Sequence, residues 1–153
     1  IVKAFKKLPA KKLKVIGDGP EFSKLKRLAK GSENIEILGY VSKAKFVSTL
    51  CKARAFINAS NEDFGIAPLE AQACGVPVIA FAKGGILETT IENKTAIYFS
   101  EQTENSIIHA ISKFEKSNLL KPEDIRSFTL SFNSERFRSE ITNFVTKCLE
   151  EKN

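Results

Sequence analysis

Short apolar runs alternate with helical patterns along this chain, and this alternation limits its fold more than any other feature. The runs cover residues 13–17, 35–38, 55–59, 76–81 and 96–99, and they are rich in the Val, Ile, Leu and Phe side chains typical of buried strands. The helical patterns cover residues 1–8, 20–29, 43–51, 68–73, 86–91, 106–116, 122–130 and 134–150. This order predicts an α/β fold, a Rossmann-like parallel sheet with helices on both faces, in which ligands bind at the carboxyl ends of the strands. The aromatic residues expected to anchor the last two helices are Phe128, Phe132, Phe137 and Phe144.

The size and hydropathy of the chain suit one domain. It has 153 residues, of which 42% are hydrophobic, and this is enough for a full core. No apolar run approaches the roughly 20 residues that span a bilayer, and no charged-then-apolar signal segment opens the chain. We therefore expect a cytoplasmic location.

Charge is unevenly distributed along the chain. Residues 1–54 hold 14 Lys and Arg against 4 Asp and Glu, whereas residues 55–153 hold 10 against 14. The basic part could contact an anionic membrane surface or simply keep a helix soluble. We favour the solvated surface, with peripheral membrane contact as the second interpretation. Nucleic acid is not expected as a partner, because the lysines are not interleaved with stacking aromatic side chains.

The cysteines and the histidine do not indicate a metal or disulfide site. Cys51, Cys74 and Cys148 are widely separated, and His109 is the single histidine. Neither a disulfide framework nor a zinc site is therefore expected. Cys74 ends a predicted helix at a place where a small residue packs under the next strand, so a structural thiol is favoured over a reactive one.

The segment NASNEDFGIAPLEAQACGVPVIAFAKGG, residues 58–85, places two glutamates eight positions apart around a loop that leads into a helix. Glu62 lies on the loop, and Glu70 lies in the first predicted helical turn. Gly65 allows close backbone approach, and the helix start attracts a phosphate through its dipole and its free donors. These donors are the N–H groups of Ile66, Ala67 and Leu69. Carboxylates bind the vicinal hydroxyls of a sugar or ribose, so the segment indicates a nucleotide sugar as the ligand.

Four segments, in this order, resemble consecutive motifs of retaining glycosyltransferases of the GT-B fold, glycosyltransferase family 4. They are KVIGDGP (14–20), NIEILGYVS (34–42), the Glu-x7-Glu segment (62–77) and GGILE (84–88). The resemblance implies that Glu62 is catalytic and contacts a hydroxyl of the donor hexose, while Glu70 holds the nucleotide ribose. It assigns the other donor contacts to Val41, Ser42, Asp63, Phe64, Gly65, Ile66, Gly17 and Gly84. Asp63 stands where the family often has glycine, which adds a side chain near the hexose. A nicotinamide site ranks low, because GDGP lacks the third glycine of the dinucleotide fingerprint.

The same resemblance implies that residues 1–153 are the nucleotide-sugar donor-binding domain of a two-domain enzyme, without its acceptor domain and without the upstream glycine loop and basic pair. We expect this part to be inactive alone and to bind nucleotide weakly. No cofactor or metal is expected, because such enzymes neutralise the diphosphate with a helix dipole and basic side chains. The C-terminal segments are similar to polysaccharide and O-antigen mannosyltransferases, so GDP-mannose is the preferred donor and a glycan or lipid-linked molecule the acceptor. UDP-glucose or UDP-N-acetylglucosamine is the alternative donor, and a noncatalytic nucleotide-binding α/β module is the alternative function.

Overall fold

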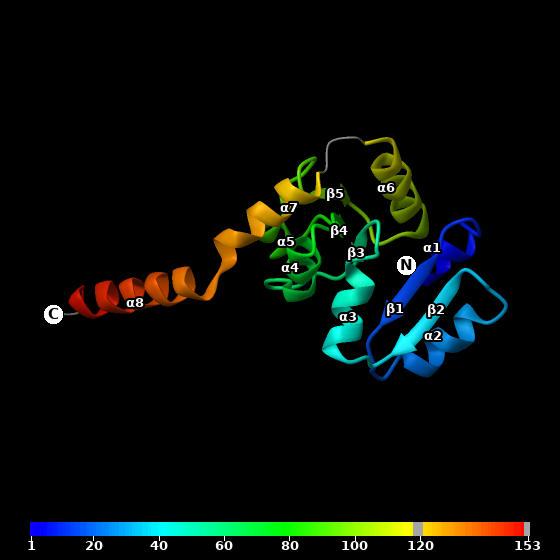
Figure 1. Ribbon diagram of the computed structural model, residues 1–153, viewed down its shortest axis with the longest axis horizontal. Coiled ribbons are helices and arrows are strands. Elements are labelled where there is room, and N and C mark those ends of the chain that lie inside the picture. Colours follow the sequence, from blue (N-terminus) through cyan, green and yellow to red (C-terminus); the bar gives the residue numbers. More distant parts are fainter. Residues whose placement is uncertain (118–120, 152–153) are drawn as a thin grey trace.

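The computed structural model describes residues 1–117 and 121–151, and Figure 1 shows strands surrounded by helices, with one helix extending away from the rest. The strands are β1 (Leu13–Ile16), β2 (Ile35–Gly39), β3 (Phe56–Asn58), β4 (Val78–Phe81) and β5 (Ala96–Phe99). The helices are α1 (Val2–Lys6), α2 (Phe22–Ala29), α3 (Lys43–Leu50), α4 (Ile66–Ala73), α5 (Ile86–Thr89), α6 (Glu104–Lys116), α7 (Pro122–Thr129), the 3-10 turn η1 (Leu130–Phe132) and α8 (Ser134–Glu150). Every predicted element is present, with its ends within two residues of the prediction, so the α/β class is confirmed. Within these residues, no helix combines the length and the apolar character needed to cross a membrane.

The strands pair in parallel, as their alternation with helices predicts. In the described residues the hydrogen-bond ladders form two sheets, β1–β2 and β3–β4–β5, where the sequence predicts one. The register pairs Leu13 with Ile35 in the first sheet and Phe56 with Val78 in the second. Alternation predicts the direction of strands but not which strands share a ladder, because pairing depends on contacts between distant parts of the chain.

One core joins the two sheets. Its buried side chains include Phe5 of α1, Leu13 of β1, Ile79 of β4, Ile97 of β5 and Ile107 of α6. α1 packs against α2 and α6, α6 lies against β5, and α4 lies against α7. Helices from both ends of the chain therefore cover the sheets. The loops that follow the strands are anchored to a well-packed core.

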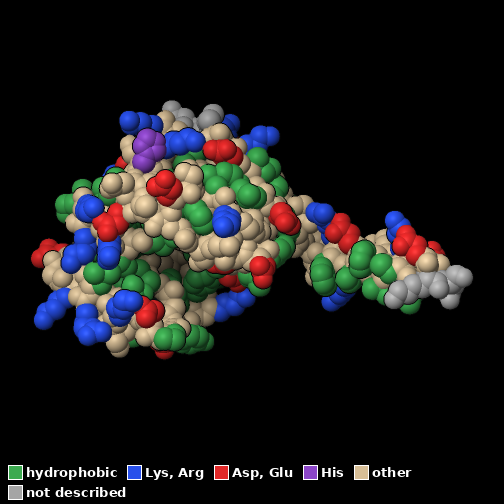
Figure 2. Space-filling model, turned by 180° about the vertical axis from the view of Figure 1, so that it is seen from behind, with side chains coloured by type: hydrophobic (Ala, Val, Ile, Leu, Met, Phe, Trp, Pro, Cys, Tyr) green, Lys and Arg blue, Asp and Glu red, His purple; other side chains and the backbone are tan. Residues whose placement is uncertain are grey.

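The last helix, α8, is the exception to this packing. It contacts η1 and extends away from the domain (Figure 1), and Figure 2 shows hydrophobic side chains gathered along it. The sequence predicts Phe137 and Phe144 as anchors, but their side chains are 67% and 64% exposed, so that prediction is wrong. The spacing of apolar residues indicates an apolar face and does not identify the surface that covers it. Phe128 and Phe132, in contrast, are in ring contact, with 5.4 Å between their centroids.

Candidate functional site

Gly65 shapes the start of α4. Its backbone has a left-handed φ of 88°, and the helix begins at the next residue, Ile66. This start lies two residues before the predicted one, so Glu70 is in the second helical turn and not in the first. Leu69 N–H, predicted to be free, donates to Gly65 O at 3.4 Å. The N–H groups of Ile66 and Ala67 remain at the helix start, where the helix offers no acceptor and its dipole favours an anion.

The loops after β3 and β4 are in direct backbone contact. Gly85 N–H donates to Glu62 O at 2.7 Å, and Glu62 forms a parallel bridge with Gly84. A Cβ on Gly84 would lie 2.5 Å from Glu62 O, and a Cβ on Gly85 would lie 2.1 Å from Asp63 O. The close approach of the two loops therefore requires both glycines, and it fixes the loop that carries Glu62 and Asp63.

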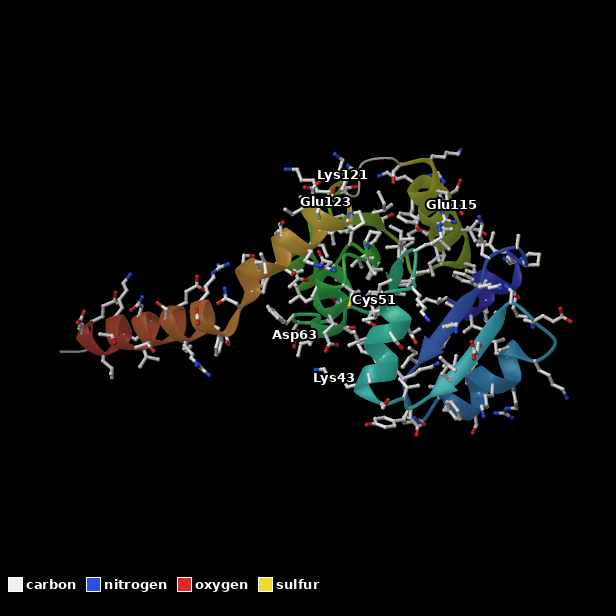
Figure 3. The ribbon with its side chains drawn as sticks, viewed as in Figure 1. Lys43, Cys51, Asp63, Glu115, Lys121 and Glu123 are labelled. Carbon is white, nitrogen blue, oxygen red and sulfur yellow. The ribbon has the colours of Figure 1, made fainter. Side chains whose placement is uncertain are left out.

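The side chains of the loop before α4 differ in their exposure. Glu62 is half-buried, and its Oε2 would lie 3.7 Å from a Cβ placed on Gly65, so this carboxylate is next to the helix start. Asp63 is exposed (Figure 3), and the Phe64 side chain is 46% exposed. The Phe64 ring meets the Phe132 ring of η1 edge to face, with 6.2 Å between the centroids. The loop is thus held at its backbone, with the Asp63 side chain exposed to solvent and Glu62 half-buried beside the helix start.

The start of α3 lies beside α4. Half-buried Val41 precedes Ser42, which caps α3 by accepting a hydrogen bond from Lys45 N–H at 3.3 Å. Lys43 (Figure 3) places its Nζ 3.9 Å from Glu70 Oε1. The exposed Lys43 side chain therefore extends from the start of α3, next to Val41 and Ser42, toward Glu70 of α4.

Gly17 lies apart from these contacts. It follows β1 with a φ of 130°, and its N–H donates to Gly39 O, at the end of β2, at 3.0 Å. In the part of the chain that the structure describes, the backbone bonds between the loops after β3 and β4 do not include Gly17. The contacts described above join the loop 62–65 to Gly84 and Gly85 and join Lys43 of α3 to Glu70 of α4, whereas Gly17 lies at the carboxyl end of β1, in the other sheet.

Two buried polar side chains beneath this site do not figure among the sequence-predicted residues. Thr89 of α5 donates to Phe64 O, and Gln72 of α4 donates to Thr89 O. The available signal was weak: Gln72 lies beside buried Ala71 in α4, and Thr89 ends a short helix in which Leu87 and Glu88 are exposed. A buried polar residue is expected to have hydrogen-bond partners, but its own position does not reveal which partners these are.

Cys74, at the end of α4, has a raised thiol pKa. Burial is the main cause of the raised pKa, followed by a hydrogen bond with the Cys51 thiol. Cys74 also packs against a buried cluster that includes Leu50 and Val76. A thiol with a raised pKa is mostly un-ionised near neutral pH, which agrees with a structural role. Across residues 1–117 and 121–151, no group of three or more His, Cys, Asp or Glu side chains could hold a metal ion.

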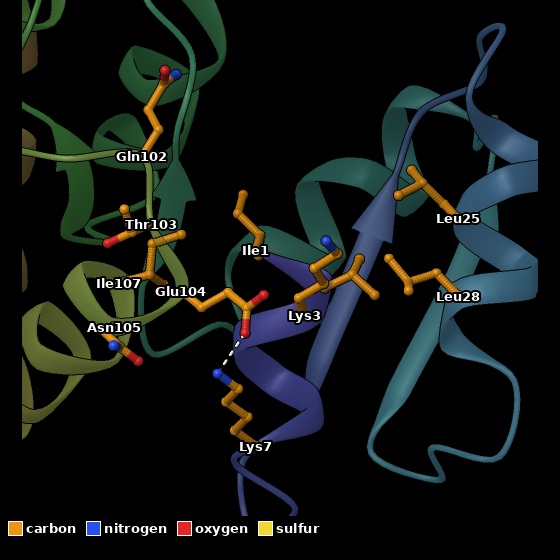
Figure 4. A pocket seen from close by; sticks show the side chains of 11 residues that line it. Ile1, Lys3, Lys7, Leu25, Leu28, Gln102, Thr103, Glu104, Asn105 and Ile107 are labelled. Atoms are coloured by element: carbon orange, nitrogen blue, oxygen red, sulfur yellow. Dashed lines mark ion pairs between the residues drawn. The ribbon is translucent and has the colours of Figure 1, made fainter.

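A separate cavity of about 580 Å³ lies between α1, α2 and the start of α6 (Figure 4). Its lining includes Ile1, Leu25, Leu28 and Glu104, and a 2.7 Å ion pair joins Lys7 Nζ to Glu104 Oε2 beside it. None of the predicted site residues lines this cavity. It is therefore distinct from the site around α4.

Comparisons with known proteins identify the family and the fold of this chain. Residues 1–129 match the family described as "Glycosyl transferases group 1". The GDP-mannose-dependent monoacylated alpha-(1-6)-phosphatidylinositol monomannoside mannosyltransferase of Corynebacterium glutamicum is 40% identical over 90 residues, which cover 53% of this chain and 24% of that protein. A glycosyltransferase structure from Rickettsia africae matches with a TM-score of 0.78 at 24% identity, over 97% of this chain and 43% of that chain. HepE of Anabaena, in complex with UDP and glucose, matches with a TM-score of 0.69 at 20% identity, over 97% of this chain and 43% of its own. This chain thus spans less than half the length of each of these proteins.

Proposed function

The chain belongs to the glycosyl transferases of group 1 and has the α/β fold of the GT-B glycosyltransferases, and we propose that it is the nucleotide-sugar donor-binding domain of a retaining hexosyltransferase of family 4. In this proposal a further domain of the whole protein binds the acceptor, a glycan or a lipid-linked molecule. Residues 1–153 hold the donor, and catalysis requires the whole protein.

The arrangement around α4 carries this proposal. Glu62 precedes and Glu70 follows a helix start whose first N–H groups have no helical acceptor. An electropositive helix end binds a diphosphate, and carboxylates bind sugar hydroxyls. The 2.7 Å bond between Gly85 N–H and Glu62 O holds the loop in place before a ligand arrives, which lowers the entropic cost of binding.

Each group at the site has a role in this proposal. Glu62 binds a hydroxyl of the donor hexose, and Glu70 binds the nucleotide ribose. The N–H groups of Gly65 and Ile66, with the α4 dipole, stabilise the negative charge that develops on the leaving diphosphate. Ser42 Oγ already accepts a hydrogen bond from Lys45 N–H. Its O–H hydrogen therefore remains available to donate to the nucleotide base of the sugar donor. The remaining proposed donor contacts are those of Val41, Asp63, Phe64, Gly17 and Gly84.

GDP-mannose is the preferred donor in this proposal. The Corynebacterium relative is named as GDP-mannose-dependent and is 40% identical over the matched segment, whereas HepE, whose structure contains UDP and glucose, is 20% identical. Calorimetric titration of the full-length protein with GDP and with UDP distinguishes the two donors. We expect the tighter binding for GDP, and tighter binding of UDP would assign a UDP-sugar instead.

Glu62→Gln in the full-length protein tests the function itself. The substitution keeps the size of the side chain and removes its charge, so sugar transfer should fall at least about tenfold, the scale of one lost preorganised contact. Glu33→Gln, at an exposed position in the turn before β2, is the matched control and should keep the wild-type rate. Equal rates for Glu62→Gln and the wild type would favour a noncatalytic nucleotide-binding module.

A further inference from the structure

Two fully buried polar side chains lie beneath the loop that precedes α4. Thr89 and Gln72 each have an exposed fraction of 0%. Buried polar groups lower stability unless they form hydrogen bonds. The bonds of these two side chains connect α4, α5 and the loop that carries Glu62.

The Thr89 hydroxyl has one hydrogen and two carbonyl oxygens within reach, which can share it. Its Oγ1 lies 3.1 Å from Gly85 O and 3.3 Å from Phe64 O. The contact with Gly85 O is the common bond from a helical threonine to the carbonyl four residues earlier. Phe64 is 25 residues away in the chain, so the second contact is not a consequence of helix geometry. It holds a loop carbonyl toward the buried side of α5.

This carbonyl belongs to the same peptide group as the N–H of Gly65. The peptide is trans, and in a planar trans peptide the C=O and N–H bonds point in opposite directions. A carbonyl held toward Thr89 therefore directs the Gly65 N–H away from the buried side of the loop. The orientation of one candidate donor-binding amide thus depends on the hydroxyl of Thr89.

Gln72 in turn holds Thr89. α5 ends at Thr89, so the carbonyl of this residue has no partner within the helix. Gln72 Nε2 donates to Thr89 O at 2.8 Å and to Pro68 O at 3.3 Å. Gln72 Oε1 is buried and has no hydrogen-bond partner within the described residues. An apolar side chain at this position would leave the buried Thr89 O without its donor, so Gln72 fixes the end of α5 against α4.

We propose that Thr89 is a positioning residue for the donor, which acts through the Phe64–Gly65 peptide, and that Gln72 fixes Thr89 for this role. The inference rests on the proposed function, because it requires the nucleotide-sugar substrate to accept a hydrogen bond from the Gly65 N–H. Thr89 is buried and does not itself touch the donor.

Three substitutions in the full-length protein separate this role from a purely structural one. Thr89→Val keeps the shape of the side chain and removes the hydroxyl, while Thr89→Ser keeps the hydroxyl. Thr90→Val is the matched control, because the neighbouring buried hydroxyl bonds Ile86 O and the Tyr98 hydroxyl and not the loop. Thr89→Ala, which also lacks the hydroxyl, replaces Thr89→Val if the valine variant fails to fold.

The first measurement observes the peptide directly. Protein labelled with carbonyl-13C phenylalanine and 15N glycine gives a selective NMR signal for each Phe-Gly step, and Phe64–Gly65 is the one such step in these 153 residues. The loss of this signal in Phe64→Leu identifies it. We expect the Gly65 signal to shift in Thr89→Val and to keep its wild-type position in Thr89→Ser and Thr90→Val.

The second measurement is sugar transfer by the same proteins. The value of kcat/KM for the donor should fall at least about fivefold in Thr89→Val and stay near the wild-type value in Thr89→Ser and Thr90→Val. An unmoved Gly65 signal in Thr89→Val, or a moved signal with wild-type transfer, would overturn the positioning role. If the wild-type protein transferred no sugar, the proposed function would fail, and the NMR comparison would still decide whether the hydroxyl sets the orientation of the peptide.

Discussion

At the scale of single residues, a close backbone approach fixes residue 85 as glycine. A Cβ at Gly85 would lie 2.1 Å from Asp63 O and 2.6 Å from Phe64 Cα, and both atoms belong to the backbone of the neighbouring loop. Real Cβ atoms essentially never come within 3.0 Å of such atoms, so the two loops must separate if a side chain is added. Because the same loop carries Glu62, the packing that stabilises the fold here also shapes the candidate site.

Gly85→Ala should therefore lower the free energy of unfolding by at least about 2 kcal/mol. Gly19→Ala is the matched control, because Gly19 is exposed and an added Cβ would meet nothing within 4 Å. Its free energy of unfolding should change by no more than about 0.5 kcal/mol. Urea unfolding followed by circular dichroism measures both variants, and equal stability of the two would contradict the close contact between the loops.

The local geometry of the candidate site was predictable from the sequence where it depends on neighbouring residues. The spacing of Glu62 and Glu70 and the glycine before the helix come from turn and helix-start patterns, which act over a few residues. The sequence places Glu70 one turn too early, because the helix begins directly after Gly65 and Pro68 is tolerated anywhere in the first turn. Thr89 could not be identified, because its loop partner is 25 residues away in the chain.

At the scale of helices and strands, one side chain joins the first helix to the strands. Asn34, in the turn before β2, donates through Nδ2 to Phe5 O at 2.9 Å, to Leu8 O at 3.1 Å and to Lys11 O at 2.9 Å. These carbonyls lie in the last turn of α1 and in the connection to β1, where a helix supplies few donors of its own. The amide group of Asn34 therefore fixes the position of α1 against the β1–β2 sheet.

Two substitutions of Asn34 distinguish the loss of its hydrogen-bond donor from the replacement of that donor by an acceptor. Asn34→Ala removes the bonds and should lower the free energy of unfolding by about 1 to 3 kcal/mol. Asn34→Asp should lower it further, because an ionised carboxylate accepts hydrogen bonds only and would face three carbonyl oxygens. Chemical denaturation near pH 7 measures both, with the exposed neighbour Glu33→Gln as the control. An aspartate variant as stable as the alanine variant would contradict this description of the turn.

The existence and order of the helices and strands were predictable, but their assembly was only partly so. Apolar spacing and helix caps are local features, which is why each element ends within two residues of its predicted position. The division into two sheets and the exposed face of α8 depend on which distant surfaces meet. The periodicity of apolar residues alone does not predict which of these surfaces are in contact.

At the scale of the whole molecule, the basic first part of the chain is joined to α6 by ion pairs. Lys7 Nζ lies 2.7 Å from Glu104 Oε2, and Lys11 pairs with Glu115. Arg54 also pairs with Glu115, at 3.4 Å. Part of the positive charge of residues 1–54 is therefore neutralised within the domain.

The two carboxyls on α6 make the free energy of unfolding depend on pH in the acidic range. The hydrogen bond from Lys7 holds the pKa of Glu104 below its usual range, and the hydrogen bond from Lys11 does the same for the pKa of Glu115. In the unfolded chain these carboxyls have the ordinary pKa of about 4.3, so below that pH the unfolded state binds more protons than the folded state. Their stabilisation is therefore present above about pH 4.3 and is lost as the pH falls through the lowered folded values.

A double variant, Glu104→Gln with Glu115→Gln, tests this linkage. Urea unfolding of the wild type and the double variant should show a difference in stability near neutral pH that shrinks as the pH falls below about 4. Added salt should reduce the same difference at neutral pH, because both ion pairs lie at the surface, where ions screen them. A difference that stays constant from about pH 6 to about pH 3 would mean that the substitutions act through packing and not through charge.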